Sequence, residues 1–175
     1  MSKKFVILSI FCVCYFASNA QIEVAKIIGK NSEKYGVGFG AFLKLAFPIS
    51  EADDISVEIG ASIFREKNSS TNGLAYVPLK LGYRYSINRT GSGFYVEPQM
   101  GYNVYGAYTT YDQTYIDKKI NGFVGSATAG YLFQPIGNIT FDLGVRFETI
   151  QFNGGSANSV AIRLSHYINL GRKRD

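Results

Sequence analysis

The chain has 175 residues and a net charge of +5, and both of its cysteines, Cys12 and Cys14, lie near its start. Acidic and basic residues are interspersed, so the weak positive excess does not indicate nucleic-acid binding, and the region after Cys14 can hold neither a disulfide framework nor a thiolate metal site. Thirteen Tyr, thirteen Phe and nineteen Gly are typical of a membrane β-barrel, which has aromatic rims and strands that bend and approach closely at glycine.

The first twenty residues resemble a secretory signal peptide. Lys3 and Lys4 precede a dozen mostly apolar residues, a run too short to span a bilayer as a helix. Small residues then stand at the −3 and −1 positions of a cleavage site before Gln21. We therefore expect residues 1–20 to be removed after export and residues 21–175 to form one outer-membrane β-barrel domain. An uncleaved anchor and a lipoprotein signal are the alternatives.

Eight segments then alternate apolar and polar residues, which gives each an apolar and a polar face because successive strand residues point to opposite sides. The first is the weakest, since Lys26 interrupts its apolar face, and the facing of the sixth, which is rich in Gly and Ala, stays open. The clearest is the seventh, with apolar residues at every second position from Ile139 to Phe147. In chain order the segments are 22–28, 35–47, 55–65, 76–87, 94–105, 123–133, 139–149 and 160–170.

The connections alternate in length. Compact turns at 48–54, 88–93 and 134–138 alternate with polar, mostly longer connections at 66–73, 106–121 and 151–158. Short periplasmic turns and longer outer loops are typical of outer-membrane barrels, and an even strand number then requires the weak first segment to be a strand. The sequence therefore predicts an all-β fold: an eight-stranded antiparallel up-and-down transmembrane β-barrel with a polar, side-chain-filled lumen.

Two prolines count against uninterrupted strands. Pro78 and Pro98 stand inside predicted strands, and proline cannot donate a hydrogen bond to the ladder. We expect a bulge or a distorted pair near each, and these could be adjacent.

A secreted lipocalin-like binder is an alternative interpretation of the strand pattern, but it would have an apolar lumen and a polar exterior. Here the charged residues gather on the face opposite Leu, Ile and Phe.

Two stretches resemble a known family. The run at 75–85 resembles the "hydrophobic-Pro-Leu-x-hydrophobic-x-Tyr" strand of the small outer-membrane β-barrel domain family, the PorT-like or porin-like group, and the run at 93–102 resembles the glycine-aromatic strand that follows it there. The resemblance implies eight antiparallel strands in the outer membrane and, for most members, no assigned activity. The end of the chain also resembles an assembly signal read by the barrel-insertion machinery, matched by Arg163, Ser165, Ile168 and Leu170. Ser165 replaces the usual glycine, and the usual terminal aromatic residue is absent.

The polar faces of the segments carry nearly balanced charges. An ion path or a catalytic carboxylate pair is one interpretation, and a structural salt-bridge network is the other. The interior of an eight-stranded barrel is just wide enough for side chains to fill, and buried charges must be paired. We therefore expect a structural network and no open pore. Its members are Lys44, Glu58, Lys80, Arg84, Glu97, Asp142, Arg146, Glu148 and Arg163.

His166 is the single histidine, and Ser165 adjoins it. Some eight-stranded outer-membrane barrels are lipid-modifying acyl hydrolases or transferases that use Ser and His, so such an enzyme is the alternative function. Neighbours on a strand point to opposite faces, however, and a Ser–His pair needs hydrogen-bond reach. We expect no enzyme, no catalytic residue, no cofactor and no metal site.

The connection at 106–121 contains Tyr108, Tyr111 and Tyr115, which could form a recognition loop for an extracellular partner or an outer aromatic girdle. The sequence thus predicts a monomeric, non-enzymatic barrel with a structural or surface-interaction role. We expect it in the outer membrane of a Gram-negative bacterium, among outer-membrane lipid and lipopolysaccharide, without nucleic acid. The identity of the loop partner stays open.

Overall fold

The structure is a computed structural model that describes residues 20–69, 72–88, 92–109, 114–116, 121–133, 139–152 and 155–168. The predicted signal peptide lies, except for Ala20, outside the described residues. None of the described residues forms a helix long and apolar enough to cross a membrane.

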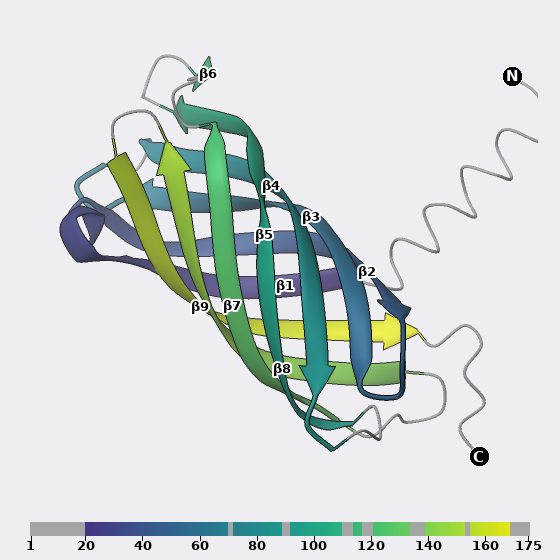
Figure 1. Cartoon of the computed structure of the whole chain (residues 1–175). Helices are drawn as coiled ribbons and strands as arrows, with labels where there is room; N and C mark the ends of the chain where they lie inside the picture. Colours follow the sequence, from purple (N-terminus) through teal and green to yellow (C-terminus); the bar gives the residue numbers. More distant parts are fainter. Residues whose placement is uncertain are drawn as a thin grey trace, which may run out of the picture.

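Across the described ranges, eight long antiparallel strands form a closed barrel (Figure 1), which confirms the predicted fold. Each strand pairs with its neighbour along the chain, and the β1–β9 pairing closes the circle. The weak first segment is a full strand, since β1 pairs with both β2 and β9. The strands are β1 (Ala20–Ile28), β2 (Tyr35–Pro48), β3 (Asp53–Glu66), β4 (Gly73–Ser86), β5 (Gly93–Thr109), β7 (Gly122–Leu132), β8 (Ile139–Phe152) and β9 (Gly155–Ile168).

The two ends of the barrel differ. The connections β1–β2, β3–β4, β5–β7 and β8–β9 lie at one end, which we call the loop end; the other three, with the start of β1 and the end of β9, lie at the turn end. The loop end also carries the short 3₁₀ helix η1 (Gly29–Asn31) and a short strand, β6 (Thr114–Ile116). β6 pairs with the last three residues of β5 and extends the sheet beyond the start of β7 (Figure 1). Sequence periodicity did not predict β6, because three residues are too few to show an alternation.

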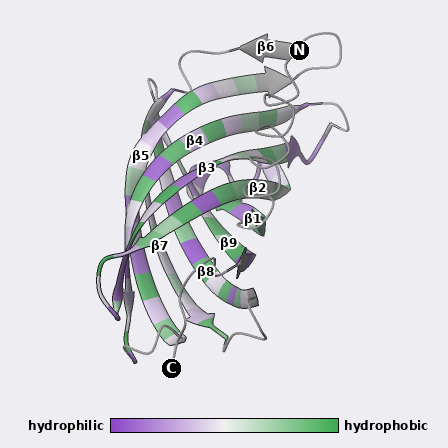
Figure 2. Ribbon diagram, turned by 90° about the vertical axis from the view of Figure 1, so that its right-hand side faces the viewer, coloured by the Kyte–Doolittle hydropathy of each residue, from purple (hydrophilic) through white to green (hydrophobic). Residues whose placement is uncertain are grey.

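Hydrophobic and hydrophilic residues alternate along the strands, as the bands of colour in Figure 2 show. This alternation gives the barrel an apolar outside. Outward residues such as Met100 and Ile162 are more than 60% exposed. The polar residues that alternate with such outward positions along each strand are buried. The facing of the sixth segment, left open by the sequence, is now defined. Phe123 and Tyr131 of β7 point outward, and Ser126 and Thr128 point inward.

Both prolines interrupt the pairing of β4 with its neighbours. The register between β4 and β5 shifts between Val77 and Pro78, and the β3–β4 ladder is interrupted opposite the same proline. Near Pro98 the β4–β5 ladder skips Tyr83 and Arg84 without a change of register. A missing N–H donor explains both defects. They are separate rather than adjacent, since Pro78 pairs with Asn103.

The interior has two parts. Toward the loop end it is apolar, with Phe64 and Tyr76 stacked at 5.9 Å between ring centroids. Toward the middle and the turn end it is charged. The prediction of a polar lumen therefore holds for only part of its length. The apolar part comprises Ala25, Ile27, Tyr35, Phe64, Leu74, Tyr76, Val124, Ile150 and Ala161.

Candidate functional site: the barrel lumen

Ten charged side chains of the described residues are buried, five acidic and five basic, and none is more than 5% exposed. They include all nine residues that the sequence analysis placed inward, together with Glu23 of β1. The sequence prediction did not include Glu23, because the alternation of the first segment is weak. Its position between the apolar residues Ile22 and Val24 is the sequence signal that identifies it as inward.

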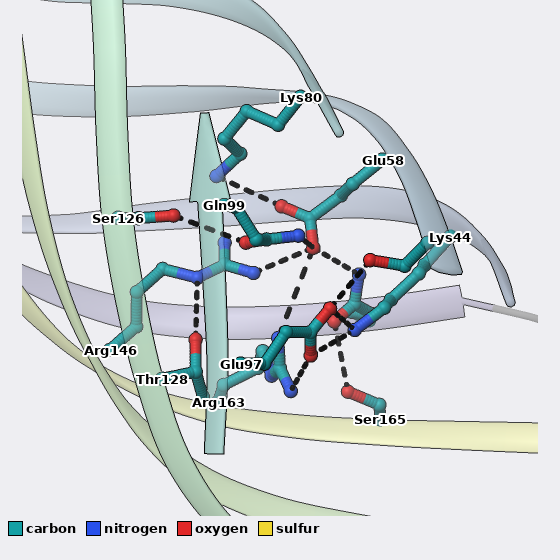
Figure 3. Close-up of polar contacts among 12 residues, drawn as sticks. Lys44, Glu58, Lys80, Glu97, Gln99, Ser126, Thr128, Arg146, Arg163 and Ser165 are labelled. Atoms are coloured by element: carbon teal, nitrogen blue, oxygen red, sulfur yellow. Dashed lines mark hydrogen bonds and ion pairs between the residues drawn. The ribbon is translucent and has the colours of Figure 1, made fainter. Parts of the chain in front are cut away.

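Glu58 of β3 is a central acceptor in the lumen (Figure 3). Its Oε2 lies 2.6 Å from Nη2 of Arg146, and its Oε1 lies 2.9 Å from Nζ of Lys80. The side-chain amides of Gln21 and Gln99 donate to the same carboxylate, at 3.0 and 3.3 Å. Five strands therefore meet at one carboxylate, because these residues come from β1, β3, β4, β5 and β8.

A second group gathers around Glu97 and Asp142. Glu97 forms ion pairs with Lys44 and with Arg84, whose Nη2 lies 3.1 Å from Oε2. Asp142 accepts from Arg163 at 3.0 Å and from the Tyr95 hydroxyl at 2.6 Å. Arg84 also lies 3.4 Å from Asp142, so the two carboxylates share this guanidinium.

The two groups form one continuous network. Nη1 of Arg163 lies 3.9 Å from Glu58 and its Nη2 lies 3.7 Å from Glu97, which joins the two carboxylates. Arg146 extends the network to Glu23 at 3.1 Å, and Lys80 extends it to Glu148. Each of the five buried carboxylates therefore has a cationic partner, which is the condition for holding charges away from water.

Large aromatic rings fill the lumen by packing onto glycines. The Phe42 ring lies over Gly40 and Gly60, and the Tyr95 ring lies over Gly130 and Gly144. A Cβ at Gly60 or Gly130 would collide with these rings. Cations also lie against both rings: the Arg84 guanidinium is 4.5 Å from the Tyr95 centroid, and Nζ of Lys80 is 5.0 Å from the Phe42 centroid. Alternation in the sequence predicts the inward glycines but not their partners, which come from other strands.

Ser165 and His166 lie on opposite sides of the wall. Ser165 is buried, and its Oγ donates to Oε1 of Gln21 at 3.2 Å. His166 pairs with Phe141, which is exposed on the outside of the barrel. The structure therefore does not bring these two side chains together. Within the described ranges, no group of three or more His, Cys, Asp or Glu residues is arranged to hold a metal ion.

Two of the three predicted recognition tyrosines fall at the loop end. Tyr108 of β5 and Tyr115 of β6 are directly paired backbone positions. Tyr111 lies outside the described residues.

Comparison with known proteins gives the fold. No family model matches the chain, and no curated protein matches it. Among solved structures, Neisserial surface protein A (NspA) has a TM-score of 0.70 at 12% identity, covering 87% of this chain and 95% of that one. The attachment invasion locus protein Ail of Yersinia pestis has a TM-score of 0.54 at 12% identity, covering 85% and 97%. The outer membrane enzyme PagL has a TM-score of 0.52 at 13% identity, covering 84% and 97%. These neighbours are small eight-stranded outer-membrane barrels.

Proposed function

We propose that this chain is a non-enzymatic outer-membrane β-barrel of a Gram-negative bacterium, with a structural or surface-interaction role and no open pore. The observation that carries the proposal is the filled lumen. Ten buried charges of balanced sign occupy its middle and turn end, and a packed apolar cluster closes its loop end. Ions would have to displace paired charges to pass, which costs several kcal/mol by the usual penalty for breaking a buried pair.

The outside of the barrel supports insertion into lipid. Its eight long strands have 9 to 17 residues, enough for tilted membrane strands, and their outward positions are mostly apolar. Exposed apolar surface on this scale is unfavourable in water. The lipocalin-like alternative fits poorly, because charged residues fill the lumen.

The site geometry favours a non-enzyme over the alternative of a lipid-modifying enzyme. The fold does not separate them, since the neighbours include both NspA and the enzyme PagL. An acyl-transfer site needs a nucleophile with a base in reach, and Ser165 and His166 face opposite sides of β9. The buried carboxylates are each engaged by cations, which leaves them poorly suited to act as general bases.

The surface-interaction role would belong to the loop end. β5 is the longest strand, and with β6 it extends the sheet past β7 into the connection that carries Tyr108, Tyr111 and Tyr115. We propose this hairpin as the contact with an extracellular partner, and we propose a monomer assembled by the barrel-insertion machinery. Membership of the PorT-like group stays a prediction.

Planar-bilayer recording tests the closed lumen. Protein whose insertion is verified by heat-modifiable gel mobility should give no steady conductance above that of the bare bilayer. A large steady conductance would show that the network leaves a path and that the proposal is wrong. An epitope inserted between residues 110 and 113 tests the surface role, since it should bind antibody on intact cells. An epitope between residues 50 and 51, at the turn end, should not.

A further inference from the structure

Five cationic side chains lie at the loop end of β1, β2 and β3, and two of them, Lys26 and Arg65, occupy outward strand positions. All five are exposed. The ion pairs found among the described residues lie inside the barrel, so none of them neutralises this group. We call it the cationic patch; it consists of Lys26, Lys30, Lys34, Arg65 and Lys67.

Two acidic residues lie close to the patch in the chain. Glu66 pairs with Tyr35, whose side chain is buried inside the barrel, so Glu66 lies on the inner side of the wall. Glu33 is exposed between η1 and β2. Even with both counted, five positive charges against two negative charges leave an excess of +3.

Two members of the patch belong to the wall itself. Lys26 pairs with Val37 on one side and Val160 on the other, and both valines are exposed on the outside. Arg65 lies opposite the β2 irregularity that contains Gly36 and Val37. Lys26, Val37 and Arg65 therefore form one row across three neighbouring strands. With about 4.8 Å between strands, the backbones of the two cationic residues are about 10 Å apart.

The row lies close to the loop-end edge of the apolar wall, which on β1 ends one outward position further along, at Ile28. Toward the turn end, outward positions below it are apolar, such as Val24 on β1 and Ile63 on β3. Beyond it, the outward positions of β9 become polar at Asn158 and Ser156. A lysine or arginine is tolerated on a lipid-facing wall at this boundary, where its stem covers apolar surface and its charge reaches the headgroups.

The patch is local rather than a property of the whole rim. At the loop end of β4, β5 and β7, the described outward residues are uncharged, for example Val77, Tyr105 and Phe123. At the turn end, the β2–β3 turn carries Glu51, and the start of β3 carries Asp53 and Asp54, all of opposite charge. The excess of positive charge is therefore confined to the β1–β3 side of the loop end.

We propose that the cationic patch binds the phosphorylated headgroup of an outer-leaflet lipid whose acyl chains lie along the apolar wall of β1–β3. This inference rests on the proposed insertion into the outer membrane. A guanidinium can bind phosphate through two parallel hydrogen bonds, and two cations in one row match a headgroup with more than one phosphate. A lipid is favoured over a soluble polyanion because Lys26 and Arg65 lie next to the apolar wall. One lipid molecule can contact the two cations with its headgroup and the apolar wall with its acyl chains.

Lipid retention tests the proposal. The full chain is inserted into phosphatidylcholine vesicles containing about a tenth lipid A, extracted in mild detergent, and its bound lipid A is counted by mass spectrometry. A parallel arm uses lipid A with both phosphates removed. We expect the wild type to retain about tenfold more of the phosphorylated form, by the strength of charge-assisted hydrogen bonds. Lys26→Gln/Arg65→Gln should lose this preference, and the charge-conserving Lys26→Arg/Arg65→Lys should keep it.

Lys118→Gln/Lys119→Gln is the matched control, since it removes the same charge from the connection at 106–121 and should keep the preference. Equal retention of both lipid forms by the wild type, or equal loss in both glutamine variants, would overturn the proposal. Heat-modifiable mobility reports insertion separately. If the wild type inserts but shows no preference for phosphorylated lipid A, only the lipid-binding proposal is wrong. If the wild type fails to insert, both the lipid-binding proposal and the proposed membrane location are wrong.

Discussion

Arg146 illustrates how single residues hold the lumen together, because its guanidinium pairs with both Glu58 and Glu23. Arg146→Ala would leave these carboxylates short of a buried cation, and we expect a loss of about 3–5 kcal/mol in the free energy of unfolding. Urea unfolding in lipid vesicles measures this loss. Lys30→Ala is the control: Lys30 is exposed at the loop end, and its removal should change stability by less than about 0.5 kcal/mol. Equal stability of the two variants would contradict a stabilising network.

Two glycines of β7 provide a second test at this scale. A Cβ at Gly130 would collide with the Tyr95 ring, whereas a Cβ at Gly125 would meet only Phe123 and Thr149 at 3.5 and 3.6 Å, which is ordinary contact. We expect Gly130→Ala to destabilise the barrel by about 1–3 kcal/mol through overpacking. Gly125→Ala should stay within about 0.5 kcal/mol of the wild type in the same unfolding measurement. Similar effects of both substitutions would show that the ring does not depend on this gap.

At the scale of a strand, the alternation of faces predicts an asymmetric response to charge. Leu81 points outward near the middle of β4 and is well exposed on the outside. Leu81→Arg should cost about 2–4 kcal/mol, since an arginine at mid-strand would face the hydrocarbon. Leu81→Ser should cost much less, because serine carries no charge. Unfolding in vesicles measures both, and an arginine variant as stable as the serine variant would contradict a lipid-facing β4.

Period-two alternation predicted the strands well because it is a local property of the sequence. It placed Asp142, Arg146 and Arg163 on inward positions before any pairing was known, and the structure finds all three buried. It could not predict which strand supplies each partner, because Glu58 and Arg146 are 88 residues apart in the chain. The apolar part of the lumen was also missed. In the sequence pattern Phe64 falls on the same face as Ser56 and Glu58. Because most residues of that face are polar, the alternation predicts a polar interior there and not an aromatic one.

For the whole molecule, we infer that the apolar exterior faces lipid around a closed interior. The chain has no cysteine after Cys14, so one thiol introduced into residues 21–175, expressed without residues 1–20, would report a single position. Leu81→Cys would test the outer wall, and Glu33→Cys would test the loop end, where Glu33 follows η1. Both side chains are exposed in the absence of a membrane, so any difference between them comes from the bilayer.

Reaction with a membrane-impermeant maleimide on protein inserted in vesicles is therefore the most direct measurement. If the outer wall faces lipid, Glu33→Cys should be labelled rapidly on outward-facing molecules, and Leu81→Cys should not be labelled until detergent is added. Labelling of Leu81→Cys at the rate of Glu33→Cys before detergent would show that the apolar face meets water and that the barrel is not inserted in lipid as inferred.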